Sequence, residues 1–81
     1  MKVRVKLFAV ARELAGSDEL IVELAEGATI GDLRASIIAT SPSLSRIVPH
    51  AMWAVGAAYA SDDTPLNEQS EIALIPPVSG G

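Results

Sequence analysis

Residues 2–7 have the sequence Lys2-Val3-Arg4-Val5-Lys6-Leu7, in which charged and apolar side chains alternate. An alternation with a period of two is typical of a β-strand that buries one face and exposes the other. The pattern therefore predicts a half-buried strand over residues 2–8, with its valines and leucine in the core and its basic side chains in water.

A second alternating stretch follows the first strand after a turn. Leu20, Val22 and Leu24 share one face of residues 19–24, which predicts a second half-buried strand. The cluster Gly16-Ser17-Asp18 just before it is typical of a turn and favours an antiparallel return. The basic row of the first strand then lies opposite Glu19 and Glu23, so we interpret it as a solvated set of cross-strand pairs.

A helix is predicted from Thr29 onward. Thr29 and Asp32 have the spacing of a capping box, in which each side chain accepts a hydrogen bond from the other residue's backbone. Apolar residues then recur at helical spacing: Ile30, Leu33, Ile37 and Ile38. Pro42 ends the helix, because the residue before a proline disfavours helical dihedral angles.

The rest of the chain predicts a small α+β domain. Residues 51–55 and 71–75 are expected to be strands, and the stretch through Gly56 to Tyr59 is compatible with a hairpin. Residues 61–65 are expected to be a turn, followed by Leu66 in the core. A short mixed sheet with one main helix packed on one face is a two-layer α+β architecture, which we assign to residues 1–75.

Composition excludes several classes of protein. The chain has 81 residues and a net charge of −4, which indicates a single domain and no nucleic-acid partner. It has no cysteine and one histidine, so we expect no disulfide and no metal site. No apolar run is long enough for a bilayer, and the first residues do not resemble a signal peptide. We therefore expect a soluble cytoplasmic protein without a membrane partner.

The last six residues, Pro76-Pro77-Val78-Ser79-Gly80-Gly81, form a separate extended tail in this interpretation. The two prolines lack the N–H groups that a strand needs, so they end the last strand and stiffen the exit. Fully extended, the residues after Pro76 reach about 15–18 Å beyond the domain. Gly80 and Gly81 have no Cβ, so the terminal carboxylate is very little hindered.

These features together resemble the MoaD/ThiS sulfur-carrier family. The resemblance lies in residues 8–16, in Asp63-Thr64-Pro65-Leu66 and above all in residues 71–81, and it spans essentially the whole chain. It implies the ubiquitin-like β-grasp fold, which agrees with the order of elements predicted above.

The resemblance also implies how the tail works. The Gly81 carboxylate would be adenylated by an ATP-dependent activating enzyme and converted with a sulfur donor to a thiocarboxylate. The larger subunit of molybdopterin synthase, in a heterotetramer, would then pass this sulfur to a pterin precursor in molybdenum cofactor biosynthesis. In this scheme the chain binds no permanent cofactor and is not catalytic alone, but is the sulfur-donating subunit of a sulfurtransferase.

Two groups of residues follow from the resemblance. The first would insert into the partner's active site ahead of Gly81: Pro76, Pro77, Val78, Ser79 and Gly80. The second would contact the partner: Phe8, Arg12 and Leu74. For Phe8 and Leu74, ordinary packing in the core is an equal alternative.

Three other functions stay open at this point. A thiamine-pathway carrier would use the same tail chemistry for thiazole synthesis. A ubiquitin-like protein modifier would attach Gly81 to lysines of other proteins, and a β-grasp binding module would not use its tail at all. His50 and the pair Asp62-Asp63 lack the neighbouring ligands of a metal site, so we interpret them as loop residues.

Overall fold

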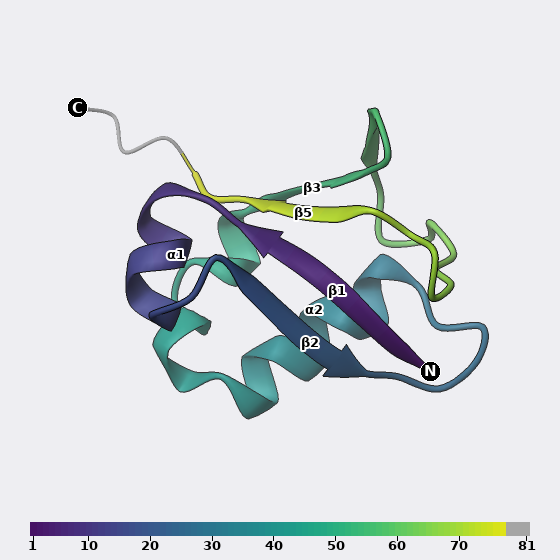
Figure 1. The fold of residues 1–81 in the computed structure, drawn as a ribbon, viewed down its shortest axis with the longest axis horizontal. Coiled ribbons are helices and arrows are strands. Elements are labelled where there is room, and N and C mark those ends of the chain that lie inside the picture. Colours follow the sequence, from purple (N-terminus) through teal and green to yellow (C-terminus); the bar gives the residue numbers. More distant parts are fainter. Residues whose placement is uncertain (78–81) are drawn as a thin grey trace.

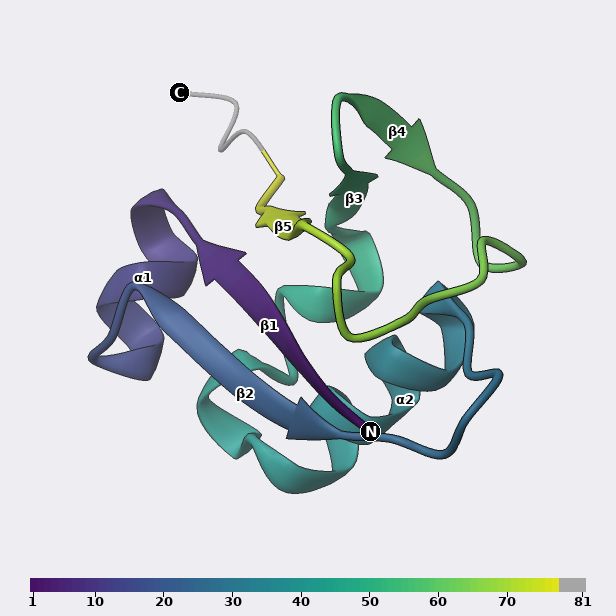
Figure 2. The same cartoon turned by 45° about the vertical axis from the view of Figure 1, so that its right-hand side comes forward.

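The computed structural model describes residues 1–77 and shows one mixed sheet of five strands (Figure 1). Its strands, short helices and 3-10 turns follow the chain in this order: β1 (Lys2–Leu7), α1 (Ala9–Ala15), β2 (Glu19–Glu23), α2 (Ile30–Thr40), η1 (Pro42–Leu44), η2 (Val48–His50), β3 (Met52–Val55), β4 (Ala58–Ala60) and β5 (Ile72–Ile75). The strands lie in the order β2-β1-β5-β3-β4 (Figure 2). β1 and β5 are parallel and the other neighbours are antiparallel.

The predicted α+β class is confirmed, with α2 and the two 3-10 turns packed on one face of the sheet (Figures 1 and 2). The core contains the apolar row of β1 and the helical row of α2, all of them buried: Val3, Val5, Leu7, Ile30, Leu33 and Ile37. Leu66 is buried as expected, and Trp53 is buried as well. Ile38 is 37% exposed, so the buried stripe of α2 is narrower than the sequence suggests.

Local signals set the ends of α2. The Thr29 side chain accepts a hydrogen bond from the Asp32 backbone N–H, and the Asp32 carboxylate accepts one from the Thr29 backbone N–H at 3.0 Å. This is the predicted capping box. Arg34 on the next turn makes two hydrogen bonds of 2.6 and 2.7 Å with the Asp62 carboxylate. The start of α2 is therefore fixed to the segment that follows β4.

The hairpin between β3 and β4 is confirmed and closes through two residues. Val55 pairs with Ala58, which leaves Gly56 and Ala57 as the loop. Gly56 has a φ of 62°, and a positive φ at the first loop position is what a type II′ hairpin turn requires. A glycine at this point is therefore explained by the turn.

The short helix α1 differs from the prediction, which for residues 9–18 was only a connection that ends in a turn. Its N-cap, Phe8, makes no side-chain capping hydrogen bond. A seven-residue helix without a cap is too short to be stable by itself. Burial of Ala11 against the core and a left-handed Gly16, whose N–H donates to the Arg12 carbonyl at 3.0 Å, hold it in place.

Within residues 1–77, no helix is both long and apolar enough to cross a bilayer. In the same part of the chain, no three His, Cys, Asp or Glu side chains gather as a metal ion would require.

Candidate functional site

The tail leaves the sheet at the end where β1 also finishes. Leu7 pairs with Leu74 in the parallel ladder, so the residues that follow each of them, Phe8 and Ile75, lie at the same end of the sheet. Figure 1 shows this end, with the start of α1 beside the last residues of β5. β5 ends at Ile75, and the half-buried Pro76 and exposed Pro77 follow.

Large apolar side chains surround this point on the face of the sheet that α2 does not cover. Met52 pairs with Ile75, and Tyr59 pairs with Ala54 two residues further along β3. Their neighbours Trp53 and Leu74 point into the core, so strand alternation turns Met52, Tyr59 and Ile75 outward. The exposed fractions are 48% for Phe8, 53% for Met52 and 72% for Tyr59. Phe8, Met52 and Ile75 lie at the end of the sheet where the tail leaves, and we call them the tail-root surface. Tyr59 lies on the same face but further away, on the outermost strand β4.

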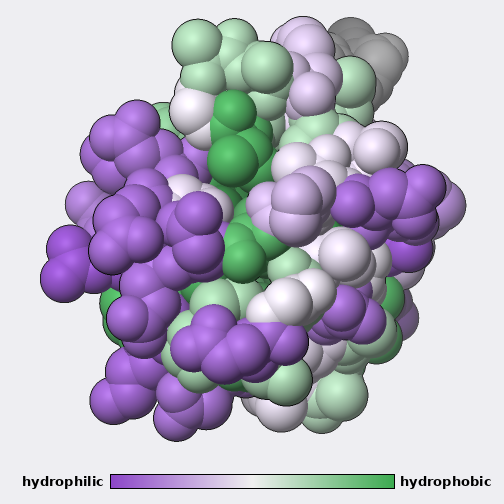
Figure 3. Space-filling model, turned by 90° about the vertical axis from the view of Figure 1, so that its right-hand side faces the viewer, coloured by the Kyte–Doolittle hydropathy of each residue, from purple (hydrophilic) through white to green (hydrophobic). Residues whose placement is uncertain are grey.

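An exposed group of large apolar side chains usually marks an interaction site. Aromatic residues and methionine are enriched at such interfaces, because they provide large contact areas. The tip of the β3–β4 hairpin differs, since Ala57 and Ala58 are small and the neighbouring Tyr59 is the large exposed side chain there. Figure 3 looks onto that end and shows a narrow hydrophobic strip between hydrophilic flanks. The tail root is thus the better candidate for partner contact.

The structure separates the residues expected to face a partner. Phe8 is half exposed and lines a small hollow of about 240 Å³ together with Arg12 and Lys6. Leu74 has no exposed surface, because it lies on the inner face of β5. Leu74 is therefore a core residue, and its assignment to a partner contact is corrected. The roles of Phe8 and Arg12 stay predictions.

Four tail residues with predicted roles lie outside the described part of the chain: Val78, Ser79, Gly80 and Gly81. Met52, Tyr59 and Ile75 were not predicted as partner contacts. The signal that could have found them is the same alternation that buries Trp53 and Leu74, because it exposes their neighbours on β3 and β5.

The backbone is strained beside Phe8. Ala9 has a φ of 51°, the only positive φ of a non-glycine residue in residues 1–77. The left-handed region costs an L-residue about 1–2 kcal/mol. Ala9 is the first residue of α1, and Phe8 just before it has an extended backbone. The chain therefore changes direction at Ala9. The conformation of Ala9 helps in this way to set where the Phe8 side chain lies.

We predict that Ala9→Gly raises the free energy of unfolding by up to about 1 kcal/mol, because glycine removes the left-handed strain but loses more chain entropy on folding. Urea unfolding measures the change. Ala15→Gly is the matched control, since Ala15 lies in the same helix without a positive φ, and it should lower stability by about 0.5–1 kcal/mol. A loss of stability in Ala9→Gly would contradict the assignment of strain.

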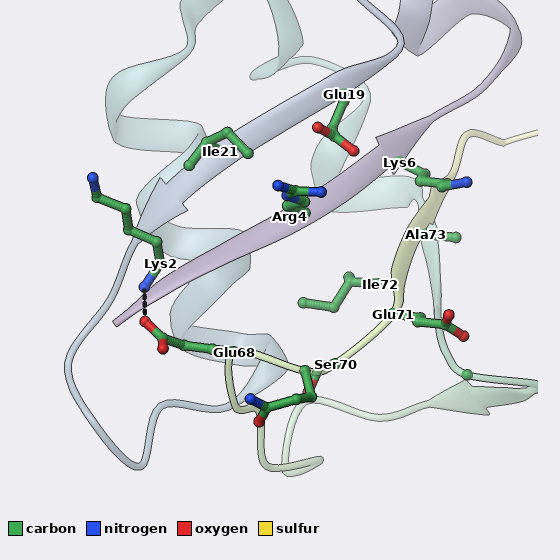
Figure 4. Close-up of a pocket in the computed structure, with 12 residues that line it drawn as sticks. Lys2, Arg4, Lys6, Glu19, Ile21, Glu68, Ser70, Glu71, Ile72 and Ala73 are labelled. Carbon is green, nitrogen blue, oxygen red and sulfur yellow. Dashed lines mark hydrogen bonds between the residues drawn. The ribbon is translucent and has the colours of Figure 1, made fainter.

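A larger groove lies over the exposed side of β1 (Figure 4) and has a volume of about 880 Å³. Lys2, Arg4 and Lys6 line it from β1. Its other charged residues are three glutamates: Glu19, Glu68 and Glu71. The Glu68 carboxylate accepts a hydrogen bond from the Lys2 backbone N–H at 3.1 Å. Three cations and three carboxylates leave the lining without net charge, so the groove favours no charged class of ligand.

The register of β1 and β2 supports the solvated interpretation of the basic row. Lys2 lies opposite Glu23, and Lys6 lies opposite Glu19, as predicted. Arg4 lies opposite Ile21. Within residues 1–77, no ion pair of 4.0 Å or less joins the three basic side chains to these glutamates. The basic row is therefore a solvated face, opposite in charge to its neighbours on β2 but without close ion pairs to them in this described part of the chain.

Comparison with known proteins identifies the family. The model of the ThiS family matches residues 5–81. The chain belongs to the ThiS family. Among curated proteins, the molybdopterin synthase sulfur carrier subunit of Chlamydomonas reinhardtii is 40% identical over 83 residues, covering 100% of both chains. The protein of the same name from Arabidopsis thaliana is 32% identical over 81 residues, covering 100% of this chain and 84% of the relative.

Two solved structures place this ThiS-family member in the β-grasp fold expected from the resemblance. Small archaeal modifier protein 1 of Haloferax volcanii superposes with a TM-score of 0.84 at 31% identity, and 100% of each chain is covered. A putative molybdopterin converting factor subunit 1 of Pyrococcus furiosus gives a TM-score of 0.83 at 34% identity, covering 96% of this chain and 99% of that one.

Proposed function

We propose that this ThiS-family chain is the sulfur carrier subunit of a molybdopterin synthase. The observation that carries the proposal is its 40% identity, over the full length of both chains, to a protein of that name. Four further curated relatives with this name, from a plant, two nematodes and an amoeba, favour molybdopterin over thiazole synthesis as the destination of the sulfur.

In this proposal Gly81 is the reacting residue. A carboxylate is a poor acyl donor until one of its oxygens becomes a good leaving group. The Gly81 carboxylate displaces pyrophosphate from ATP on an activating enzyme and becomes an acyl-adenylate. A sulfide-level sulfur nucleophile from a donor then attacks the acyl carbon and displaces AMP, and the product is a thiocarboxylate. Tethered to the domain, this sulfur reaches the partner's active site at a high effective concentration.

The tail-root surface supports a protein partner in this role. Phe8 and Met52 are each about half exposed at the base of the tail. A large subunit that binds them would bury apolar area while it receives Pro76, Pro77 and the residues that follow. The chain itself then carries the sulfur and holds it in place, and the partner supplies the catalytic groups.

The direct test is reconstitution with a molybdopterin synthase large subunit and a pterin precursor. Chain carrying a thiocarboxylate at Gly81 should give molybdopterin, and chain with the unmodified carboxylate should give none. Equal product from both forms would overturn the proposal.

A prediction about the tail-root surface follows. Phe8→Asp should weaken binding of the large subunit at least about tenfold, because a charge replaces an apolar contact and must be desolvated. Calorimetric titration measures the affinity. Ile21→Asp is the matched control, since Ile21 is 53% exposed but lies on β2, and it should leave affinity unchanged. Equal losses in both variants would contradict the assignment of the surface.

A second function has a specific observation in its favour. The Haloferax volcanii structure with a TM-score of 0.84 is named a small archaeal modifier protein. We therefore keep attachment of Gly81 to lysine side chains of other proteins as the alternative. Isopeptide adducts of this chain in cell extracts, lost when Gly81 is removed, would establish it.

A further inference from the structure

We propose that Met52 is an oxidation-sensitive position of this protein, where conversion of the thioether to a sulfoxide weakens binding of the partner at the tail root. The effect on binding rests on the proposed function. The chain contains no cysteine and two methionines. Met52 and Met1 are therefore the side chains whose sulfur a peroxide can oxidise.

The two methionines differ sharply in access. Met52 is 53% exposed on the uncovered face of the sheet. The Met1 side chain is 1% exposed and packs against the core. A peroxide must reach the sulfur to transfer its oxygen, and susceptibility follows exposure. The structure therefore assigns fast oxidation to Met52 and slow oxidation to Met1.

The chemistry is a simple oxygen transfer. The thioether sulfur attacks one peroxide oxygen, the O–O bond breaks, and water leaves while the sulfur becomes a sulfoxide. The sulfur is oxidised by two electrons and the peroxide is reduced by two. The product is polar and chiral, whereas methionine is apolar and flexible, and such a change disrupts methionine-containing interfaces.

The place of Met52 links this change to binding. Met52 pairs directly with Ile75, the last strand residue before the tail, and belongs to the tail-root surface. Its side chain lies on the face opposite the core residues Trp53 and Leu74. Oxidation should therefore leave the fold intact and still place a polar S=O group where the partner buries apolar area.

The test treats the full chain with hydrogen peroxide and follows each methionine by peptide mass spectrometry. Met52 should gain one oxygen well before Met1. The affinity of the oxidised chain for the large subunit should fall at least about tenfold, since burying an unpaired polar group is costly. The thermal unfolding midpoint should stay that of the untreated chain. Bound large subunit should slow the oxidation of Met52.

Two variants make the test specific. Met52→Leu keeps an apolar side chain without oxidisable sulfur, and peroxide should not change its affinity from its own untreated value. Met52→Gln places a polar group there without peroxide and should bind more weakly than the parent chain. Oxidation of Met1 as fast as Met52, or unchanged affinity of a chain oxidised at Met52, would overturn the inference. Failure of the untreated chain to bind the large subunit would instead overturn the proposed function.

Discussion

Removal of Gly81 is expected to abolish thiocarboxylate formation and sulfur transfer. Each residue of extended chain spans about 3.3–3.6 Å. In the shortened chain the terminal carboxylate on Gly80 therefore lies about that distance from the position where the activating enzyme expects it. A misplacement of 1 Å can already cost about a hundredfold in rate. Intact-mass spectrometry after incubation with the activating enzyme, ATP and a sulfur donor measures the effect. The parent chain should gain the mass of one oxygen-to-sulfur exchange, and the shortened chain should gain nothing.

Two controls separate chemistry from folding in this experiment. The shortened chain should unfold at the parent's temperature, because the core residues all lie within residues 3–74. Addition of one glycine after Gly81 moves the carboxylate the other way and should also stop the exchange. A shortened chain that still gains sulfur would contradict the role of Gly81 and make a β-grasp binding module the better hypothesis.

The parts of the fold that the sequence predicted are those with a local or periodic signal. Val3, Val5 and Leu7 alternate with charged residues, so the strand and its buried face follow from a period of two. Thr29 and Asp32 are three residues apart, so their reciprocal hydrogen bonds depend only on residues that are close in the sequence. Both features appear in the structure as predicted.

Features that depend on tertiary contacts were harder to predict. Helix α1 lacks an N-cap hydrogen bond and depends on packing of Ala11. A segment of seven residues is too short to show a helical periodicity that would predict this packing. Whether Phe8 or Leu74 faces a partner depends on which side of the sheet α2 covers. The parallel pairing of β1 with β5 brings residues 67 positions apart together, as Leu7 and Leu74 show. The tail-root surface is a product of that pairing.

Replacement of the buried leucine of β5 should have the largest effect on stability. Leu74→Ala should lower the free energy of unfolding by about 3 kcal/mol, within the usual 2–5 kcal/mol for such changes. Leu74 has no exposed surface and lies between Leu7 and Trp53 in the sheet. The neighbouring strands are fixed by hydrogen bonds and cannot close the cavity. Because small domains are stable by only about 5–15 kcal/mol, urea unfolding should show a greatly reduced midpoint.

Phe8→Ala is the matched variant, because both positions were candidates for the same role. Phe8 is half exposed, so its loss should cost less than about 1 kcal/mol of stability while binding of the large subunit weakens. Leu74→Ala should show the reverse, with affinity per folded molecule largely kept once the unfolded fraction is subtracted. A Leu74→Ala chain that is as stable as the parent but binds poorly would return Leu74 to the partner surface. The pair of variants therefore separates the residue that holds the sheet together from the residue that the sheet presents.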